Sequence, residues 1–302
     1  MSFHEKLDYT ATATLLNISR ILPETAVYAM FKGFALAFYH LGKRRRRLAI
    51  RNTEIAFPDK KLQERKSFVR RSYIILAESM ALSLLIMTRR ISRERLRGMV
   101  ETDDWGRFDQ VLQETGSKGF LTVTGHLGNW ELMSQYLGVR LERPLHVVAR
   151  QGNNRLIDDR IVRPMREHFG VSVFYKKNAL MRMVKAINKG DICGTLIDQK
   201  LNPPEGIYVD LFGKPAPTTN SAALLQIRFD IKVVPIFMVK TGHRRYRMII
   251  DEPIPWTDNG KSFEEQVIEL TLLQQKVIED MVRRYPDQWF WSHNRWGLPK
   301  EK

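Results

Sequence analysis

A histidine and a glutamate could form a general-base pair in the stretch TVTGHLGNWELM, residues 122–133. His126 follows a short apolar run, and Glu131 lies five residues further on. A carboxylate that accepts a hydrogen bond from one ring nitrogen fixes the tautomer and makes the other nitrogen more basic, as removal of a proton from a hydroxyl requires. The alternative is a buried histidine beside an unrelated surface acid. Spacing alone does not separate these two interpretations.

The residues around this pair favour a turn between a strand and a helix. On one continuous helix, residues five apart are separated by about 140° and do not share a face. Gly125 and Gly128 can supply a turn that folds the carboxylate back onto the ring. We therefore expect a strand that ends at Thr124 and a helix with Glu131 in its first turn, whose N–H groups could also face an oxyanion.

The elements that position the pair alternate along the chain. Residues 44–98 have a helical pattern, and beyond about residue 116 strand-like and helix-like runs follow one another. The expected strands are residues 119–124, 145–149, 171–175, 192–197, 206–212, 232–239 and 245–251, and the expected helices between them are residues 129–137, 154–168, 179–188 and 218–228. This alternation predicts an α/β fold with a mixed, largely parallel sheet flanked by helices. Sites in such folds form at the carboxyl ends of strands, where His126 is expected.

The charge of the chain favours an anionic partner. Forty-nine Lys and Arg against 33 Asp and Glu give a formal net charge of +16, which suits nucleic acid, anionic lipid or an acidic protein. No nucleic-acid recognition motif accompanies this charge. The single cysteine, Cys193, excludes an intramolecular disulfide.

An apolar and aromatic segment, Pro23–Arg47, is the strongest membrane signal. It has about one bilayer's length, with Lys32 in its middle and the basic cluster Lys43–Arg47 at its end. A spanning helix and an interfacial helix compete, because the central lysine makes insertion costly, and a core helix is the third alternative. We expect a membrane-associated segment over residues 1–48 and a catalytic domain over residues 49–302, with no secretory signal.

Several other chemistries lack their usual motifs. The sequence has no G-x-S-x-G elbow, no H-E-x-x-H, no phosphate-binding Walker loop, no dinucleotide fingerprint and no paired cysteines for zinc. Arg150, after an expected strand, could bind an anion or polarise a carbonyl, or could be a surface arginine. Asp198 could orient His126 instead of Glu131, or could be a cap or turn residue.

Six segments together resemble a known family. GHLGNWE resembles the H-x₄-D/E motif of the lysophospholipid acyltransferase superfamily, and the other segments resemble its branch that performs late acylations of lipid A. These are RRLAIRNTEIAFPDK, VARQGNNRLIDDRI, INKGDICGTLIDQK, VDLFGKPAPTTNSAALL and DQWFWSHNRWG, in the order of the chain. The resemblance spans nearly all of the sequence. Leu211 and Asn294 depart from the pattern, at positions where Phe and Arg are common in the branch.

The resemblance implies a glycerolipid acyltransferase-like fold and a lauroyl- or myristoyltransferase-like reaction. A fatty acyl chain would pass from acyl carrier protein or coenzyme A to a hydroxyl of a lipid A precursor, an anionic glycolipid, at the cytoplasmic face of the inner membrane. No metal, cofactor, nucleic acid or covalent acyl-enzyme is implied. His126 would be the base and Glu131 would hold its ring. The resemblance assigns oxyanion or substrate binding to Arg150, Asn153, Asp198, Gly213, Thr218 and Arg295.

Three alternatives stay open after the resemblance. The acceptor could be a lysophospholipid or another glycolipid. More remotely, the chain could be a basic membrane scaffold or a nucleic-acid-binding protein. His293 and Arg295, in an aromatic C-terminal run, are more typical of braces than of bases.

Overall fold

The computed structural model describes residues 3–102, 105–176 and 178–299. The helices are α1 (Phe3–Ile21), α2 (Glu24–Leu41), α3 (Lys43–Ala56), α4 (Leu62–Met87), α5 (Arg93–Gly98), α6 (Trp105–Thr115), α7 (Trp130–Arg140), α8 (Arg155–Ile157), the π-helix η1 (Asp158–Val162), α9 (Arg163–Arg166), α10 (Ala179–Asn188), α11 (Ser221–Phe229) and α12 (Phe263–Arg284). The strands are β1 (Val100–Thr102), β2 (Leu121–Thr124), β3 (Leu145–Ala149), β4 (Val171–Tyr175), β5 (Ile192–Leu196), β6 (Ile207–Leu211), β7 (Lys214–Thr218), β8 (Val233–Gly242) and β9 (Arg245–Ile250).

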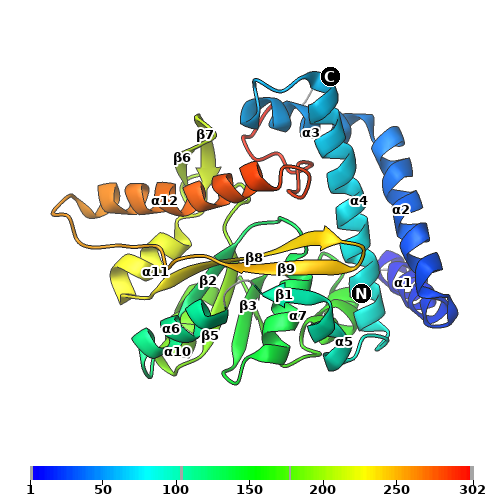
Figure 1. Ribbon diagram of the computed structural model, residues 1–302, viewed down its shortest axis with the longest axis horizontal. Coiled ribbons are helices and arrows are strands. Elements are labelled where there is room, and N and C mark those ends of the chain that lie inside the picture. Colours follow the sequence, from blue (N-terminus) through cyan, green and yellow to red (C-terminus); the bar gives the residue numbers. More distant parts are fainter. Residues whose placement is uncertain (1–2, 103–104, 177, 300–302) are drawn as a thin grey trace.

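Seven strands form one mixed sheet in the order β1-β9-β8-β2-β5-β3-β4 (Figure 1). The neighbours β8, β2, β5, β3 and β4 are parallel, while β9 returns antiparallel to β8 through a tight hairpin. Parallel strands need long crossovers, which the intervening helices supply. The predicted α/β class with a largely parallel sheet is confirmed.

Hydrophobic side chains cover both faces of the sheet. On β8, Val233, Phe237 and Val239 join one core with α10, α11 and α12, whereas Val234 and Met238 join the other with α4, α6 and α7. This alternation follows from the two-residue period of a strand. A sheet buried on both faces leaves its strand ends as the place for a polar site.

Most expected elements are present, with corrections at several places. Residues 206–212 do not join the sheet but form β6, paired with β7 in a separate two-stranded hairpin. Sequence analysis did not predict β1, β7, α6 or the long α12 that crosses over the sheet (Figure 1). The expected helix 154–168 is divided into α8, η1 and α9.

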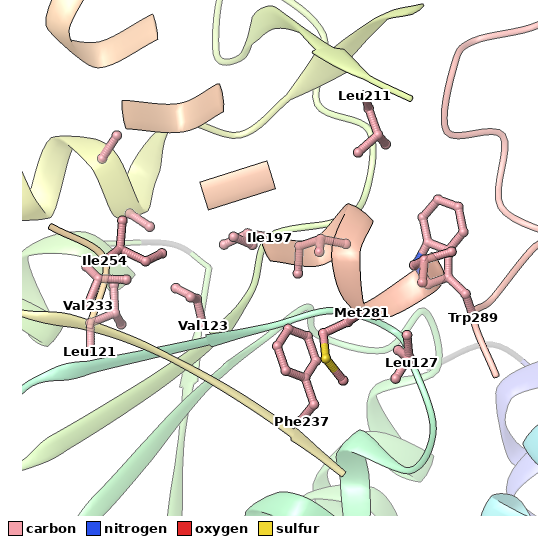
Figure 2. Close-up of a cluster of buried hydrophobic side chains, with 14 of the residues drawn as sticks. Leu121, Val123, Leu127, Ile197, Leu211, Val233, Phe237, Ile254, Met281 and Trp289 are labelled. Carbon is pink, nitrogen blue, oxygen red and sulfur yellow. The ribbon is translucent and has the colours of Figure 1, made fainter. Parts of the chain in front are cut away.

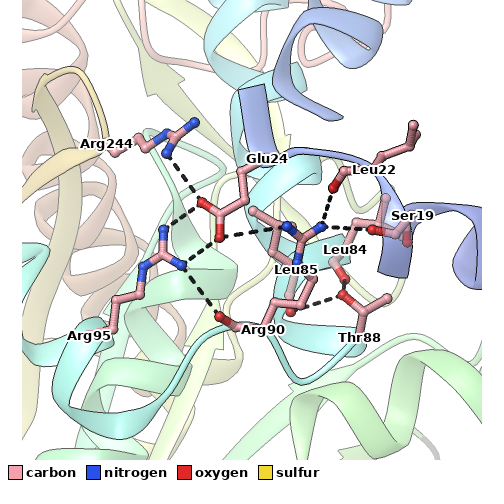
Figure 3. Close-up of polar contacts among 9 residues, drawn as sticks. All are labelled: Ser19, Leu22, Glu24, Leu84, Leu85, Thr88, Arg90, Arg95 and Arg244. Carbon is pink, nitrogen blue, oxygen red and sulfur yellow. Dashed lines mark hydrogen bonds and ion pairs between the residues drawn. The ribbon is translucent and has the colours of Figure 1, made fainter. Parts of the chain in front are cut away.

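An arginine cluster ties the N-terminal helices to the body of the protein that contains the sheet (Figure 3). Glu24, at the start of α2, accepts two hydrogen bonds of 2.6 Å from Arg95 on α5, and a third of 3.2 Å from Arg244 in the β8–β9 hairpin. Arg90 donates to two carbonyls at the α1–α2 junction, at 2.8 and 2.7 Å. The hydrogen bond from Arg95 lowers the pKa of Glu24. The pair with Arg95 is bidentate and half-buried, so it holds the start of α2 against α5.

None of the helices in the described residues combines the length and apolar character needed to cross a bilayer. The spanning form of the segment Pro23–Arg47 is therefore not supported. Gly42 separates its two halves, α2 and α3. The expected division between residues 48 and 49 lies inside α3 and stays a prediction.

Candidate active site

The site lies where two neighbouring parallel strands end. His126 follows β2 and Asp198 follows β5, and the last residues of these strands, Thr124 and Leu196, are paired in the sheet. The N–H of Ile197 donates to the carbonyl of Thr124 at 3.0 Å, which continues the pairing one residue further. Residues 72 positions apart in the chain therefore meet at the carboxyl edge.

Asp198 holds His126 through both backbone and ring. Its Oδ1 contacts the ring nitrogen Nδ1 of His126 at 2.7 Å, and its Oδ2 accepts from the backbone N–H of His126 at 2.7 Å. The indole N–H of Trp289 donates to the same Oδ2 at 2.8 Å. Burial alone would raise the pKa of Asp198, but His126 and these donors outweigh it and lower the pKa to about 2. The carboxylate is therefore ionised at neutral pH.

This contact decides which ring nitrogen can act as a base. The ionised carboxylate accepts a hydrogen bond from Nδ1, so in the neutral ring of His126 the proton lies on Nδ1 and the lone pair lies on Nε2. The side-chain amide nitrogen of Gln199 lies 3.0 Å from Nε2. The ring is 20% exposed, whereas the Asp198 side chain is 3% exposed. One nitrogen thus faces the buried carboxylate and the other faces the side-chain amide of Gln199.

Two glycines permit the approach of Asp198 and the turn after β2; the turn was expected from the sequence, but as the means of bringing Glu131 to the ring. A Cβ on Gly125 would lie 3.2 Å from both Cγ and Oδ2 of Asp198. Gly128 has a φ of +62°, and a Cβ there would lie 2.0 Å from the carbonyl oxygen of Met238. The chain can therefore turn between β2 and α7 only with glycine at residue 128.

The residues beside the pair are anchored in the core. Figure 2 shows Leu127 and Ile197, the chain neighbours of His126 and Asp198, together with Trp289 among buried apolar side chains. Leu127 and Ile197 are each 1% exposed. The backbone that carries His126 and Asp198 is thus anchored in the core on both strands.

The predicted contact between Glu131 and His126 needs a correction. Glu131 does lie in the first turn of α7, but its carboxylate is bound by Arg166 of α9, at 2.5 Å from Nη2 and 3.1 Å from Nε. The carboxylate at the ring is Asp198, which the sequence left as the alternative. The competing guanidinium, brought by a helix 35 residues away in the chain, decides where the glutamate points.

Arg150 and Asn153 lie along the same edge of the sheet. Arg150 directly follows β3, the neighbour of β5, and its side chain is exposed. Asn153 is also exposed. The asparagine at the R-x-x-x-N spacing is the next residue, Asn154, which caps α8 and donates to the carbonyl of Glu5 at 2.9 Å.

The other expected binding residues brace the β6–β7 hairpin. Gly213 forms its turn with a φ of +71°. Arg295 is 1% exposed and donates to the carbonyl of Pro217 and to Oγ1 of Thr218, both at 2.6 Å. Burial lowers the pKa of Arg295 to about 10. These contacts occupy the guanidinium inside the protein, so they correct the expectation that it binds substrate.

His293 is likewise internal. Its Nε2 accepts the backbone N–H of Lys200 at 3.1 Å, and burial lowers its pKa to about 4. The ring is therefore neutral at pH 7 and fixes the segment that follows Asp198. The expectation of a structural histidine agrees with this geometry.

Three residues that contact the pair, and Arg166, which binds Glu131, were not assigned a role from the sequence. Trp289 and Gln199 stand in quoted segments, DQWFW and DQK, but their roles were not assigned. Trp130 packs edge-on to the ring of His126, with centroids 4.9 Å apart, and its only signal is its place beside the glutamate. Arg166 carried no signal, because its partner is set by the packing of α9. Within the described ranges, no three His, Cys, Asp or Glu side chains converge as a metal site.

The chain is similar to known proteins over nearly its whole length. The family model for bacterial lipid A biosynthesis acyltransferases matches residues 3–297. The chain is 26% identical to the lipid A biosynthesis lauroyltransferase of Escherichia coli over 292 residues. This aligned stretch is 93% of this chain and 88% of that protein. It is 24% identical over 256 residues to the palmitoleoyltransferase of the same organism, with 84% and 79% covered. A lipid A biosynthesis acyltransferase of Haemophilus influenzae is 25% identical over 289 residues, with 93% and 88% covered. The chain is therefore an acyltransferase that belongs to the bacterial lipid A biosynthesis acyltransferase family.

Proposed function

We propose that the chain transfers a fatty acyl group from a thioester to a hydroxyl of a lipid A precursor, with His126 as the general base and Asp198 as its orienting carboxylate. The observation that carries this proposal is the 2.7 Å contact between Asp198 and Nδ1, which leaves Nε2 as the basic nitrogen. The names of the relatives support the acceptor class.

In the proposed reaction, Nε2 of His126 removes the proton of the acceptor hydroxyl as its oxygen attacks the thioester carbonyl. The tetrahedral intermediate collapses with cleavage of the carbon–sulfur bond, and the imidazolium returns the proton to the departing sulfur. The products are an ester and a thiol. Asp198 stabilises the imidazolium, because its ionised carboxylate lies against Nδ1–H.

We propose that the ion pair between Glu131 and Arg166 positions the helix turn beside His126. The two charges neutralise each other, and both side chains are about four-fifths buried. Glu131 follows Trp130, which packs on the ring of His126, so the ion pair fixes the helix turn that carries this tryptophan. We propose a positioning role for Glu131, rather than proton transfer.

The donor and the acceptor are both proposed to bind along a basic surface. Arg150 is exposed at the same sheet edge as His126 and suits a phosphate of the acceptor or the carbonyl of the thioester. The net charge of +16 suits an acidic acyl carrier protein as the donor, with coenzyme A as the alternative.

We further propose that α1 and α2 lie on the surface of an anionic membrane. Seven large apolar side chains on these helices are exposed: Leu7, Leu15, Ile18, Ile21, Phe34, Phe38 and Leu41. Directly after them, α3 begins with exposed Lys43, Arg44 and Arg45. Apolar side chains beside a basic cluster are typical of interfacial helices. The bond from Asn154 to Glu5 joins α1 to the segment after β3, which would bring the membrane to the substrate edge.

The catalytic proposal is tested with purified protein, an acyl thioester and a lipid A precursor. His126→Gln should fold normally and lose ester formation by at least about 10²-fold. Equal rates in the variant and the parent would reject the base assignment. Activity on a lysophospholipid acceptor alone would show that the proposed acceptor is wrong and that the lysophospholipid is the substrate. Mass spectrometry of total lipids from cells with and without the protein identifies the acceptor.

The membrane proposal is tested by flotation with vesicles. The double change Phe34→Glu and Phe38→Glu should strongly reduce binding to vesicles that contain phosphatidylglycerol. The double change Ile268→Glu and Leu272→Glu, on the exposed face of α12 and with the same change in charge and spacing, is the matched control. Binding of the parent should fall as salt rises. Equal loss in both variants would show that the α2 face is not the docking surface.

A further inference from the structure

The side chain of Gln199 covers the nitrogen on which the proposed reaction depends. Its amide nitrogen lies 3.0 Å from Nε2 of His126. In the neutral imidazole, whose single proton lies on Nδ1 against Asp198, Nε2 is an acceptor and the amide of Gln199 is the donor. The lone pair of the proposed base is therefore already engaged by a hydrogen bond before any acceptor binds.

Only the side chain of Gln199 is free to leave this position. The residues on both sides are held: Asp198 by its contacts with the ring and backbone of His126, and Lys200 by the bond from its backbone N–H to His293. The Gln199 side chain is half-buried. Rotation about its own side-chain bonds is thus enough to uncover Nε2, without movement of β5 or of Asp198.

We propose that Gln199 caps His126 until an acceptor hydroxyl displaces it, and thereby restrains hydrolysis of the bound thioester by water. This proposal rests on the proposed role of His126 as the base. In the restrained side reaction, Nε2 removes a proton from water, the water oxygen attacks the thioester carbonyl and the carbon–sulfur bond breaks. The proton then passes to the sulfur, and the products are a fatty acid and a thiol.

The cap discriminates because the acceptor has binding contacts that water lacks. A bound lipid brings its hydroxyl to Nε2 at high effective concentration and can replace the amide. Water has only its own hydrogen bonds with which to compete. One neutral hydrogen bond shifts such a competition by about two- to twelvefold.

The test uses Gln199→Met, which has a similar length but no N–H. The ratio of acceptor-independent hydrolysis to ester formation should rise by about two- to twelvefold. Carbethoxylation of His126 by diethyl pyrocarbonate, followed by peptide mass spectrometry, should become faster by a similar factor in the absence of substrates. Gln113→Met, the same change on the exposed face of α6, should alter neither quantity. Gln199→Asn, whose amide is one carbon too short, is the second variant if the first does not fold.

The outcomes separate this inference from the proposed function. An unchanged hydrolysis ratio and an unchanged modification rate would overturn the cap, even if His126→Gln abolishes ester formation. Addition of His126→Gln to the Gln199→Met protein should return hydrolysis to the background rate. Hydrolysis that persists without the imidazole would overturn both proposals, because the base would then be another group.

Discussion

Replacement of Asp198 by asparagine should remove base catalysis while nearly preserving shape. The carboxylate accepts three hydrogen bonds, one at Oδ1 and two at Oδ2. An asparagine has one acceptor oxygen. With its oxygen toward Trp289, its NH₂ group faces Nδ1 of His126 and favours the tautomer that protonates Nε2. With its oxygen toward Nδ1, its NH₂ group opposes two N–H donors instead.

Both orientations carry a cost that the structure allows us to estimate. A pKa lowered from 3.8 to about 2 corresponds to roughly 2 kcal/mol of stabilisation by the ionised carboxylate. We expect the free energy of unfolding to fall by about 1–3 kcal/mol, as for other buried hydrogen-bond losses. Loss of the correct tautomer should reduce kcat by about 10³- to 10⁴-fold.

The assay combines ester formation with urea unfolding, and the chain offers a matched control. Asp191 holds His146 at 2.8 Å between the other ends of the strands. Asp191→Asn therefore disturbs a second histidine–carboxylate pair far from the proposed chemistry. Its stability should change modestly and its kcat by less than about twofold.

Acid titration checks the direction in which stability changes with pH. Because the folded-state pKa of Asp198 is depressed, the stabilisation is present above about pH 4 and is lost as pH falls through about 2. The stability difference between the parent and Asp198→Asn should therefore shrink by about 1 kcal/mol between pH 5 and pH 3. Retention of more than a tenth of parental kcat by Asp198→Asn would refute the reasoning.

Three further outcomes are expected. Gly125→Ala should lose at least about tenfold in activity, because its Cβ would press on the carboxylate of Asp198. As the control, Gly33→Ala on α2, where a Cβ meets nothing within 4 Å, should leave stability unchanged or raise it by up to about 1 kcal/mol. Rate measurements and thermal unfolding of both variants check this. His293→Gln should make stability less pH-dependent between pH 6.5 and 4, because the depressed pKa of that ring costs stability as pH falls through this window; an unchanged slope in urea titrations would contradict this. Glu131→Gln and Arg166→Gln should together cost less than the sum of the single changes, because each single change leaves a lone charge; an additive double-mutant cycle would contradict the ion pair.

Much of the site could be predicted because it depends on local patterns. The alternation of strand-like and helix-like runs placed His126 at the end of β2, and Gly125 and Gly128 marked the turn after it. The order of the quoted segments identified the family. Residues such as Trp289 and Gln199 stood in those segments, yet their contacts with the pair are made between distant parts of the chain.

Tertiary packing decided which carboxylate meets the imidazole. Glu131 is close to His126 in sequence, but its carboxylate is bound by Arg166 from a different helix. Asp198 is 72 residues away, and the pairing of β2 with β5 brings it to the ring. The sequence by itself determined the strand ends, the glycine turn and the candidate acids, because these follow from local backbone preferences. Whether Glu131 or Asp198 contacts His126 was decided only by the tertiary structure, because a hydrogen-bond partner depends on which strands become neighbours.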